Sequence, residues 1–417
     1  PSAIPAVEPS APADEEPARE AGAHLRPKRE SVLLRDHEVD ISKARYRPGL
    51  GLEFKSSDGR FALATRLRAQ FRYTLNHDGE AGETTQGMQI RRARLQFKGH
   101  FWNEHNKFKT EFALSPRDMG LRDGAASRTP ILDWYLDFTY LRDLSLRVGQ
   151  YKLPYSRQRV VSSGDLQLVD RSIANSEFTV DRDIGFDLHS KDLFGLGRLR
   201  YNAGIYMGEG RDQYQTDTFE MLYVGRVEVL PFGMFKDYKE ADFERSLKPR
   251  LSLGVGYAYM DGGKRNRGVT GSTPTDGGTT DYQNATVDVV FKIAGFSLFS
   301  DFFFRNGTRS FGDATIVDES GIESPADLEA ARNGLGWSAQ VGYLLPRTSL
   351  ELAGRYGQTR KTQDDSGVPD RDEAGGGLSY YFAGHPLKLQ LDYFARWEGM
   401  PEDKTDHEVR LQLQAAF

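Results

Sequence analysis

Apolar and polar residues alternate with a period of two over long stretches of this chain. Between residues 60 and 73, the odd positions carry Phe, Leu, Thr, Ala and Tyr, whereas the even positions carry four arginines, one glutamine and two alanines. Residues 409–417 repeat the pattern, with Val, Leu, Ala and Phe against Arg, Gln and Ala. Successive side chains of a β-strand point to opposite faces, so the alternation predicts strands with one apolar and one polar face.

Fourteen further segments of the same kind lie between these two, which makes sixteen in all. They span residues 90–101, 107–114, 132–140, 144–153, 183–190, 198–207, 221–230, 251–259, 285–293, 296–304, 335–345, 349–356, 374–382 and 387–397. Most have about ten residues, the length that a tilted strand needs to cross a bilayer. We therefore predict an all-β chain that forms a 16-stranded antiparallel transmembrane β-barrel.

The connections between these segments alternate between short and long. Short ones include residues 294–295 and 383–386, whereas long ones rich in Gly, Asp and Thr include residues 261–282 and 305–334. The connection at residues 231–248 is an exception, because it is long where the pattern requires a short one. Short periplasmic turns at one end and long extracellular loops at the other are typical of outer-membrane barrels.

A soluble barrel or sandwich would also alternate, with its apolar faces packed inside. The alternation alone leaves this alternative open, because a soluble protein would simply solvate the polar faces. The alternation of loop lengths, the number of strands without helices and the aromatic residues near segment ends favour a membrane barrel. These aromatic residues include Tyr73, Trp102, Tyr140, Trp397 and Phe417. No stretch approaches ~18 consecutive apolar residues, so a transmembrane helix is excluded.

Composition disfavours several other functions. The chain has no Cys, which excludes disulfides and thiol chemistry, and its net charge of −5 gives no overall attraction to nucleic acid. The eight histidines form no close pair with metal-ligand spacing, and no nucleophile motif of a hydrolase occurs. We therefore predict no enzymatic activity, no cofactor, no metal site and no nucleic-acid partner. A structural or adhesive barrel, with the long loops as binding surfaces, stays open as an alternative.

Residues 1–49 differ in composition from the rest of the chain. Six of the 18 prolines fall within residues 1–30, next to many Ala and Glu residues. Such a segment buries too little apolar surface to offset the entropy that it loses on ordering. We expect a flexible periplasmic tail at residues 1–49, followed by a barrel domain at residues 50–417.

Six motifs follow one another along the chain in a specific order. They are GLEFKSSDGRFALATRLRAQFRY (51–73), IRRARLQFKGHF (90–101), FKTEFAL (108–114), LSLRVGQYKLPYS (144–156), DRDIGFDL (181–188) and GRVEVLPFG (225–233). Together they resemble the phosphate-selective porin family of Gram-negative outer membranes. The resemblance implies a 16-stranded homotrimer within outer-membrane lipid and lipopolysaccharide, whose third long loop folds into the lumen. Phe417 resembles the assembly signal of such proteins, although Ala415 stands where a second aromatic residue is expected.

Sixteen strands leave a water-filled lumen, and the parity of positions along each strand indicates which side chains face it. The first half of the wall is strongly basic. Its predicted pore-wall residues are Arg66, Arg68, Arg72, Arg92, Arg94, Lys98, Lys109, Arg147, Arg198, Arg200 and Arg226. The loop at residues 154–182 follows the fifth strand and is the natural constriction, where Arg157, Arg159 and Arg171 are predicted to act.

A low-dielectric wall focuses the field of these charges, and guanidinium groups bind phosphate oxygens through paired donors. The sequence therefore predicts passive diffusion of small hydrophilic anions, with phosphate or polyphosphate first. The third loop contains arginines but no Lys, whereas the prototypes of the resembled family use lysines around the constriction. A porin for other solutes, without phosphate selectivity, therefore stays open as an alternative.

Overall fold

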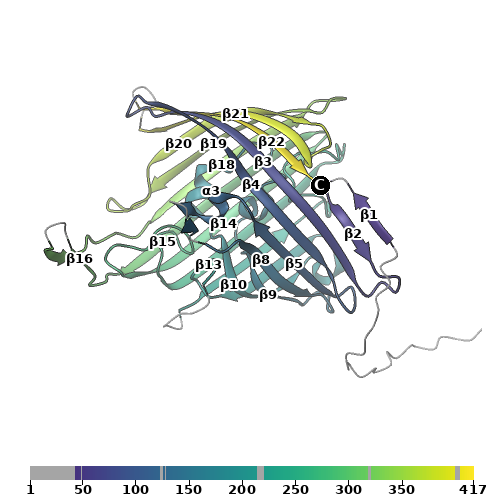
Figure 1. The fold of residues 1–417 in the computed structure, drawn as a ribbon, viewed down its shortest axis with the longest axis horizontal. Coiled ribbons are helices and arrows are strands. Elements are labelled where there is room, and N and C mark those ends of the chain that lie inside the picture. The colour runs from purple at the N-terminus through teal and green to yellow at the C-terminus, as the bar shows by residue number, and fades with distance from the viewer. Residues whose placement is uncertain are drawn as a thin grey trace, which may run out of the picture. The chain divides into compact units, whose positions relative to one another are not determined.

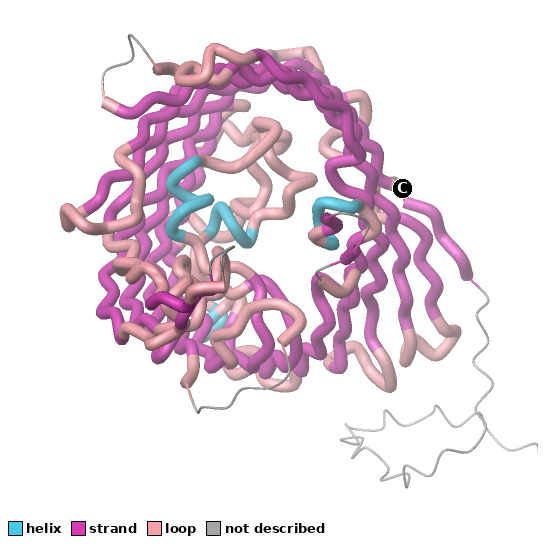
Figure 2. The backbone as a smooth tube through the Cα atoms, turned by 60° about the vertical axis from the view of Figure 1, so that its left-hand side comes forward, coloured by secondary structure: helices cyan, strands magenta, loops and turns pink. Residues whose placement is uncertain are grey.

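In the computed structural model, an antiparallel sheet closes on itself to form a barrel (Figures 1 and 2). The structure describes residues 43–47, 49–122, 125–126, 128–213, 220–317, 321–399 and 404–417. Residues 1–42, which make up most of the predicted periplasmic tail, lie outside these described residues.

Sixteen strands in the described part of the chain make up the barrel, each paired antiparallel with the next. They are β3 (Ala62–His77), β4 (Thr84–His100), β5 (Asn106–Ala113), β8 (Ile131–Phe138), β9 (Ser145–Lys152), β10 (Arg182–Ser190), β11 (Leu199–Tyr206), β12 (Leu222–Val229), β13 (Arg250–Gly263), β14 (Thr279–Ile293), β15 (Phe296–Ser310), β18 (Gly334–Leu344), β19 (Leu350–Lys361), β20 (Arg371–Tyr381), β21 (Leu387–Glu398) and β22 (Asp406–Ala416). Pairing of β22 with β3, from His407 with His77 to Ala416 with Arg68, closes the ring. The predicted 16-stranded antiparallel barrel is confirmed.

The other elements in the connections are short. They are α1 (Pro116–Met119), β6 (Leu121–Arg122), β7 (Ala125–Ala126), α2 (Arg157–Val160), α3 (Ile173–Phe178), η1 (Leu193–Gly195), β16 (Thr315–Val317) and β17 (Glu323–Pro325). The pairs β6–β7 and β16–β17 form small hairpins in long loops. Within the described ranges, no helix is long and apolar enough to cross a membrane.

Each of the sixteen predicted segments coincides with a barrel strand, but some strands extend further toward the long loops. β4 begins at Thr84 rather than at residue 90, and β14 begins at Thr279 rather than at residue 285. The added residues are mostly polar, and they pair with β3 and β15. Backbone hydrogen bonds need no apolar side chain, so the alternation pattern underestimates how far a strand continues beyond the apolar band.

The side chains are arranged with polar groups inside the barrel and apolar groups outside. On β22, Gln412 and Gln414 have exposed fractions of 1% and 0%, whereas Leu411 and Leu413 between them are each 42% exposed. A soluble barrel would bury the leucines and expose the glutamines. The reverse arrangement is the one in which the outer face contacts lipid and the inner face encloses water.

One irregularity in the barrel changes which residues face inward. In the pairing of β3 with β4, Gln70 lies opposite Arg92 and Phe71 lies opposite Ile90, so Arg91 is an extra residue in a β-bulge. Even-numbered positions of β4 point inward after the bulge and outward before it, where Ile90 is exposed. As a result Arg91 and Arg92 both point into the barrel, where each approaches a carboxylate of an inward-folded loop.

A hairpin of β1 (Lys43–Arg47) and β2 (Gly51–Lys55) adds to one edge of β3. β2 pairs with residues 62–65 of β3, next to the place where Phe417 and Leu67 exchange two backbone hydrogen bonds. The hairpin therefore prolongs the barrel wall beside the C-terminus (Figure 1), and it spans the predicted boundary between tail and barrel.

Candidate functional site

The connection between β9 and β10, residues 153–181, folds into the interior of the barrel (Figure 2). Hydrogen bonds hold it against strands that are distant in the sequence. The side chain of Gln167 donates to Glu351 of β19 at 2.7 Å, and the N–H of Val169 donates to Asp392 of β21 at 2.9 Å. We call this segment the constriction loop, and its inward fold agrees with the one that the family resemblance implies.

Two short helices and a set of apolar side chains give the constriction loop its shape. Ser156 and Ser172 cap α2 and α3, because their hydroxyls accept hydrogen bonds from backbone N–H groups three residues further on. Phe178 of α3 stacks on Phe303 of β15, with ring centroids 6.3 Å apart. The apolar run in the middle of the loop is buried, and its members are Leu166, Leu168 and Val169. The loop therefore has a small core of its own inside a polar lumen.

A cavity of about 690 Å³ lies between the constriction loop and the wall, and it reaches Asn76 and Thr85 near the tip of the β3–β4 hairpin. Ten arginines and three carboxylates line it. The arginines are Arg72, Arg91, Arg92, Arg117, Arg159, Arg171, Arg267, Arg371, Arg396 and Arg410, and the carboxylates are Asp170, Asp181 and Glu408. Guanidinium groups stay protonated at any physiological pH, so the cavity carries a large excess of positive charge. We call it the arginine cavity.

A second cavity of about 550 Å³ shares Asp181 and Thr270 with the arginine cavity. It contributes further basic side chains, which are Arg128, Arg182, Arg211 and Arg265, together with the carboxylates of Glu209 and Asp212. The positive charge therefore continues from one cavity into the next.

Three arginines of the wall share the carboxylate of Asp170 in the constriction loop. Arg72 lies 3.2 Å from it, Arg92 3.5 Å and Arg91 3.7 Å. Burial alone would raise the pKa of Asp170, but the guanidinium groups of Arg92, Arg72 and Arg91 hold that pKa well below its usual value. The carboxylate therefore stays ionised, and since it faces three positive charges, the group as a whole stays positive.

Replacing Asp170 with asparagine is expected to increase the preference for anions. The change removes the negative charge that three arginines share and leaves the shape of the side chain nearly unchanged. The permeability ratio of chloride to potassium should rise by roughly two- to fivefold, which corresponds to about 0.5–1 kcal/mol of electrostatic free energy. Reversal potentials across planar bilayers measure this ratio. Asp143→Asn, in a short turn away from the cavity, is the control, and an equal ratio in both variants would contradict the expectation.

Several basic side chains have only neutral hydrogen-bond partners among the described residues. Arg68 donates to the hydroxyls of Ser162 and Ser163 at 3.3 and 3.1 Å. Lys152 and Arg171 donate to backbone carbonyls of the constriction loop. Such partners satisfy the donors without cancelling the charge. Other basic residues with no described carboxylate within 4.0 Å include Arg66, Lys98, Arg117 and Arg198.

The structure brings some of the predicted site residues together and separates others. The arginine cavity contains Arg72, Arg92, Arg159 and Arg171, of which Arg159 pairs with Asp181. Along the wall, other predicted residues form ion pairs: Arg94 with Glu111 and Asp118, Lys109 with Glu111 and Asp133, and Arg147 with Asp137. No cluster of three or more side chains suited to holding a metal ion occurs in the part of the chain that the structure describes.

Arg157 of the constriction loop lies instead in a cluster of ion pairs with Arg200 and Arg226 of the wall, in which Arg157 and Arg226 are buried and Arg200 is partly buried. The guanidinium of Arg157 is 2% exposed and lies 2.6 Å from Asp237 and 2.5 Å from Asp288. Arg226 pairs with Asp288 at 2.7 Å, and Arg200 pairs with Asp237 at 2.9 Å. Arg157 is predicted from the sequence to act at the constriction, and in the structure protein carboxylates occupy the donors of its guanidinium.

The parity argument did not identify several arginines of the cavity. Arg91 was not assigned to the lumen because the β-bulge shifts the parity of β4 at that position. The adjacent arginines Arg91 and Arg92 were nevertheless visible in the sequence. Arg117 belongs to α1 and Arg267 to a long loop, and no strand periodicity applies to either. Their positions depend on loops that fold back toward the lumen, which alternation along a strand does not report.

Comparisons with known proteins agree with this architecture. The model of a family described as phosphate-selective porin O and P matches residues 61–417. An uncharacterized protein of Aquifex aeolicus is 24% identical over 359 residues, which cover 78% of this chain and 80% of the relative. The anion-selective porin from Comamonas acidovorans has a TM-score of 0.57 at 11% identity, with 86% of this chain and 100% of that porin covered. The outer membrane channel DcaP of Acinetobacter baumannii has a TM-score of 0.53 at 14% identity, with 87% and 99% covered.

Proposed function

The chain belongs to the phosphate-selective porin O and P family and is a porin of the Gram-negative outer membrane, and on this basis we propose that it conducts small hydrophilic anions by passive diffusion. Phosphate and polyphosphate are the proposed principal solutes. The observation that carries this proposal is the arginine cavity, in which ten arginines face three carboxylates.

The chemistry of the lining supports anion passage in two ways. A cavity lined by one sign of charge inside a low-dielectric wall raises the local concentration of the opposite ion. Guanidinium groups also hold phosphate oxygens through two parallel hydrogen bonds, which a chloride ion cannot accept in the same way. Since the arginines are spread over the loop and several strands, an ion meets many weak sites rather than one tight site, as conduction requires.

Reversal potentials in planar bilayers under a KCl gradient test the proposal. An anion-selective channel is the expected result. A cation-selective channel would overturn the proposal, and the absence of channels would favour the structural or adhesive alternative. The porin from Comamonas acidovorans, which shares the fold, is described as anion-selective, and this gives the proposal indirect support.

Phosphate at millimolar concentration is expected to block the chloride current, and Arg117→Gln is expected to weaken the block by roughly fivefold. Arg117 is an exposed residue of the arginine cavity with no described carboxylate partner, so its loss removes about 1 kcal/mol of attraction without breaking an ion pair. Titration of the chloride current with phosphate measures the block. Arg142→Gln, in an exposed short turn, should leave the block unchanged. A porin without phosphate selectivity would show no block in any variant.

We also propose that three copies assemble into a homotrimer within outer-membrane lipid, including lipopolysaccharide. The support is the resemblance to porins together with the exposed apolar side chains of the outer wall, such as Phe186, Val227, Leu391 and Leu411. A detergent-corrected mass measurement tests the number of copies.

A further inference from the structure

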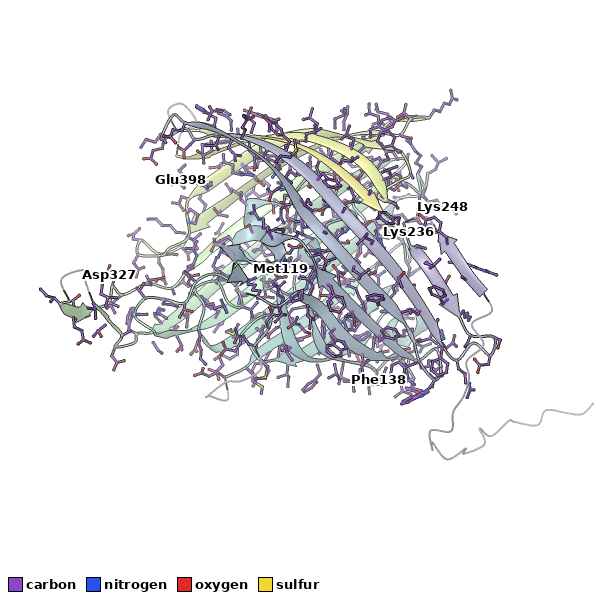
Figure 3. All side chains as sticks on the ribbon, in the orientation of Figure 1. Met119, Phe138, Lys236, Lys248, Asp327 and Glu398 are labelled. Carbon is purple, nitrogen blue, oxygen red and sulfur yellow. The ribbon has the colours of Figure 1, made fainter. Side chains whose placement is uncertain are left out.

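The connection between β12 and β13, residues 230–249, is much longer than the other turns at the same end of the barrel, which is the end where the C-terminal residue Phe417 lies. Its neighbours at that end are as short as residues 294–295, between β14 and β15. Figure 3 shows Lys236 and Lys248 of this connection at the end opposite Asp327 and Glu398, which belong to long loops. We call residues 230–249 the inner turn. Two residues are enough to connect antiparallel strands, so the inner turn is much longer than the connection requires.

The inner turn is folded tightly against the barrel wall. Lys292 of β14 donates its Nζ hydrogens to the carbonyls of Lys236 at 2.9 Å and Lys239 at 2.5 Å. The carboxylate of Asp242 accepts a hydrogen bond from the N–H of Gly295 at 2.8 Å. Further along, Phe243 packs edge-on against a tyrosine of β20. These contacts attach the inner turn to β14, to the turn that follows β14 and to β20.

The inner turn also meets the constriction loop, although the two enter the barrel from opposite ends. Asp237 lies 2.6 Å from the guanidinium of Arg157. Glu240 accepts a hydrogen bond from the N–H of Gln167 at 2.7 Å, and its own N–H donates to the carbonyl of Asp165 at 3.1 Å. Asp237 and Glu240 are both buried, so these contacts are shielded from water and salt.

Together the two segments cover carboxylates of the wall. Arg157 of the constriction loop and Tyr238 of the inner turn contact Glu228, and Arg157 also contacts Asp288. Elsewhere the constriction loop contacts Glu351 and Asp392 through Gln167 and Val169, as described above. All four wall carboxylates are buried. The wall of β3 and β4, in contrast, keeps basic side chains without carboxylate partners, such as Arg66 and Lys98.

We infer that the inner turn is a specificity-determining element, in which Asp237 and Glu240 are positioning residues that hold the constriction loop over the acidic part of the wall. The constriction loop also contacts β3 and β4, through Arg68, Arg72 and Asp170, and the space that stays open between the loop and the wall is the arginine cavity, where positive charge dominates. This inference rests on the proposed anion conduction and adds to it, because it makes selectivity depend on a segment that does not line the arginine cavity.

The double variant Asp237→Asn/Glu240→Gln tests the inference in planar bilayers. The loss of two carboxylates should release the constriction loop, raise the single-channel conductance by about twofold and move the chloride-to-potassium permeability ratio toward one as the lumen widens and wall carboxylates become accessible. A role in folding alone would not shift this ratio. The single variant Asp237→Glu, in which Glu240 is unchanged, keeps a carboxylate at both positions and should retain the parental permeability ratio. The matched control is Glu244→Gln, at an exposed position of the same turn, where the ion-pair partner among the described residues is Lys236.

The outcomes separate the inference from the proposed function. An anion-selective parent whose double variant keeps the parental conductance and permeability ratio would overturn the inference alone. A cation-selective parent would overturn the proposed function, and the inference with it. If the double variant does not assemble, Glu240→Gln by itself replaces the charge-assisted hydrogen bond from the N–H of Gln167 with a weaker neutral one and leaves the Arg157 cluster intact. The same change in permeability ratio, at smaller size, is then expected, and an unchanged ratio would overturn the inference.

Discussion

Replacing Arg91 and Arg92 with glutamine is expected to lower the chloride-to-potassium permeability ratio by roughly thirtyfold, because each positive charge contributes about 1 kcal/mol at a distance of about 4 Å in a water-filled lumen. Both side chains line the arginine cavity, and the β-bulge in β4 points both of them inward. Their loss leaves Arg72 as the described ion-pair partner of Asp170 within 4.0 Å, so the local surplus of positive charge falls. Reversal potentials under a KCl gradient measure the change.

Two controls distinguish charge from fold in this experiment. Arg91→Lys/Arg92→Lys keeps both charges and should retain most of the anion preference, although lysine lacks the paired donors that hold phosphate. Arg142→Gln/Arg347→Gln removes two charges from short turns outside the cavity and should leave the ratio unchanged. If the glutamine variant conducts with the parental ratio, the arginine cavity is not on the ion path, and the central support for anion conduction is lost.

Replacing Arg157 with alanine is expected to destabilise the protein by about 3–5 kcal/mol, which is the usual cost of removing one partner from a buried ion pair. Asp237, Asp288 and Glu228 all lie within 3.2 Å of its guanidinium and would be left with two arginines between them. The buried carboxylates would then carry uncompensated charge. Thermal or denaturant unfolding of the barrel in detergent measures the loss of stability.

The same variant distinguishes the structural placement of Arg157 from the role predicted for it from sequence. If Arg157 anchors the constriction loop, Arg157→Ala lowers stability and alters conductance, while Arg159→Gln at the cavity changes the phosphate block with a smaller loss of stability. Arg157→Lys keeps the charge and should recover part of the stability, since lysine cannot reproduce the several directed hydrogen bonds of the guanidinium. A stable Arg157→Ala variant with a weakened phosphate block would favour the role as an ion contact.

The barrel itself was predictable from local pattern. A strand that separates lipid from water must alternate with a period of two, and the width of the bilayer sets how long the alternation lasts. Both constraints act within a single strand, so Leu411 and Gln412 could be assigned to opposite faces without knowledge of any other part of the chain. The resemblance of the ordered motifs added the family and the inward third loop.

The interior of the barrel was predictable only in part. Parity placed Arg72 and Arg92 in the lumen, but it missed Arg91, because a β-bulge depends on how two strands pair rather than on either strand alone. It also could not separate Arg171, which lines the arginine cavity, from Arg157, which is buried among carboxylates.

The unusual length of residues 231–248 was visible in the sequence, but its meaning was not. Asp237 and Arg157 are 80 residues apart, and they meet only because the closed barrel brings two loops from opposite ends into one lumen. The sequence by itself determined the strands, their inner and outer faces and the excess of arginine, since these follow from repeated local geometry. Only the tertiary structure decided which arginines remain open to solvent and which are neutralised by a carboxylate. An ion pair depends on the distance between two side chains, and for residues far apart in the sequence that distance is set only when the barrel closes.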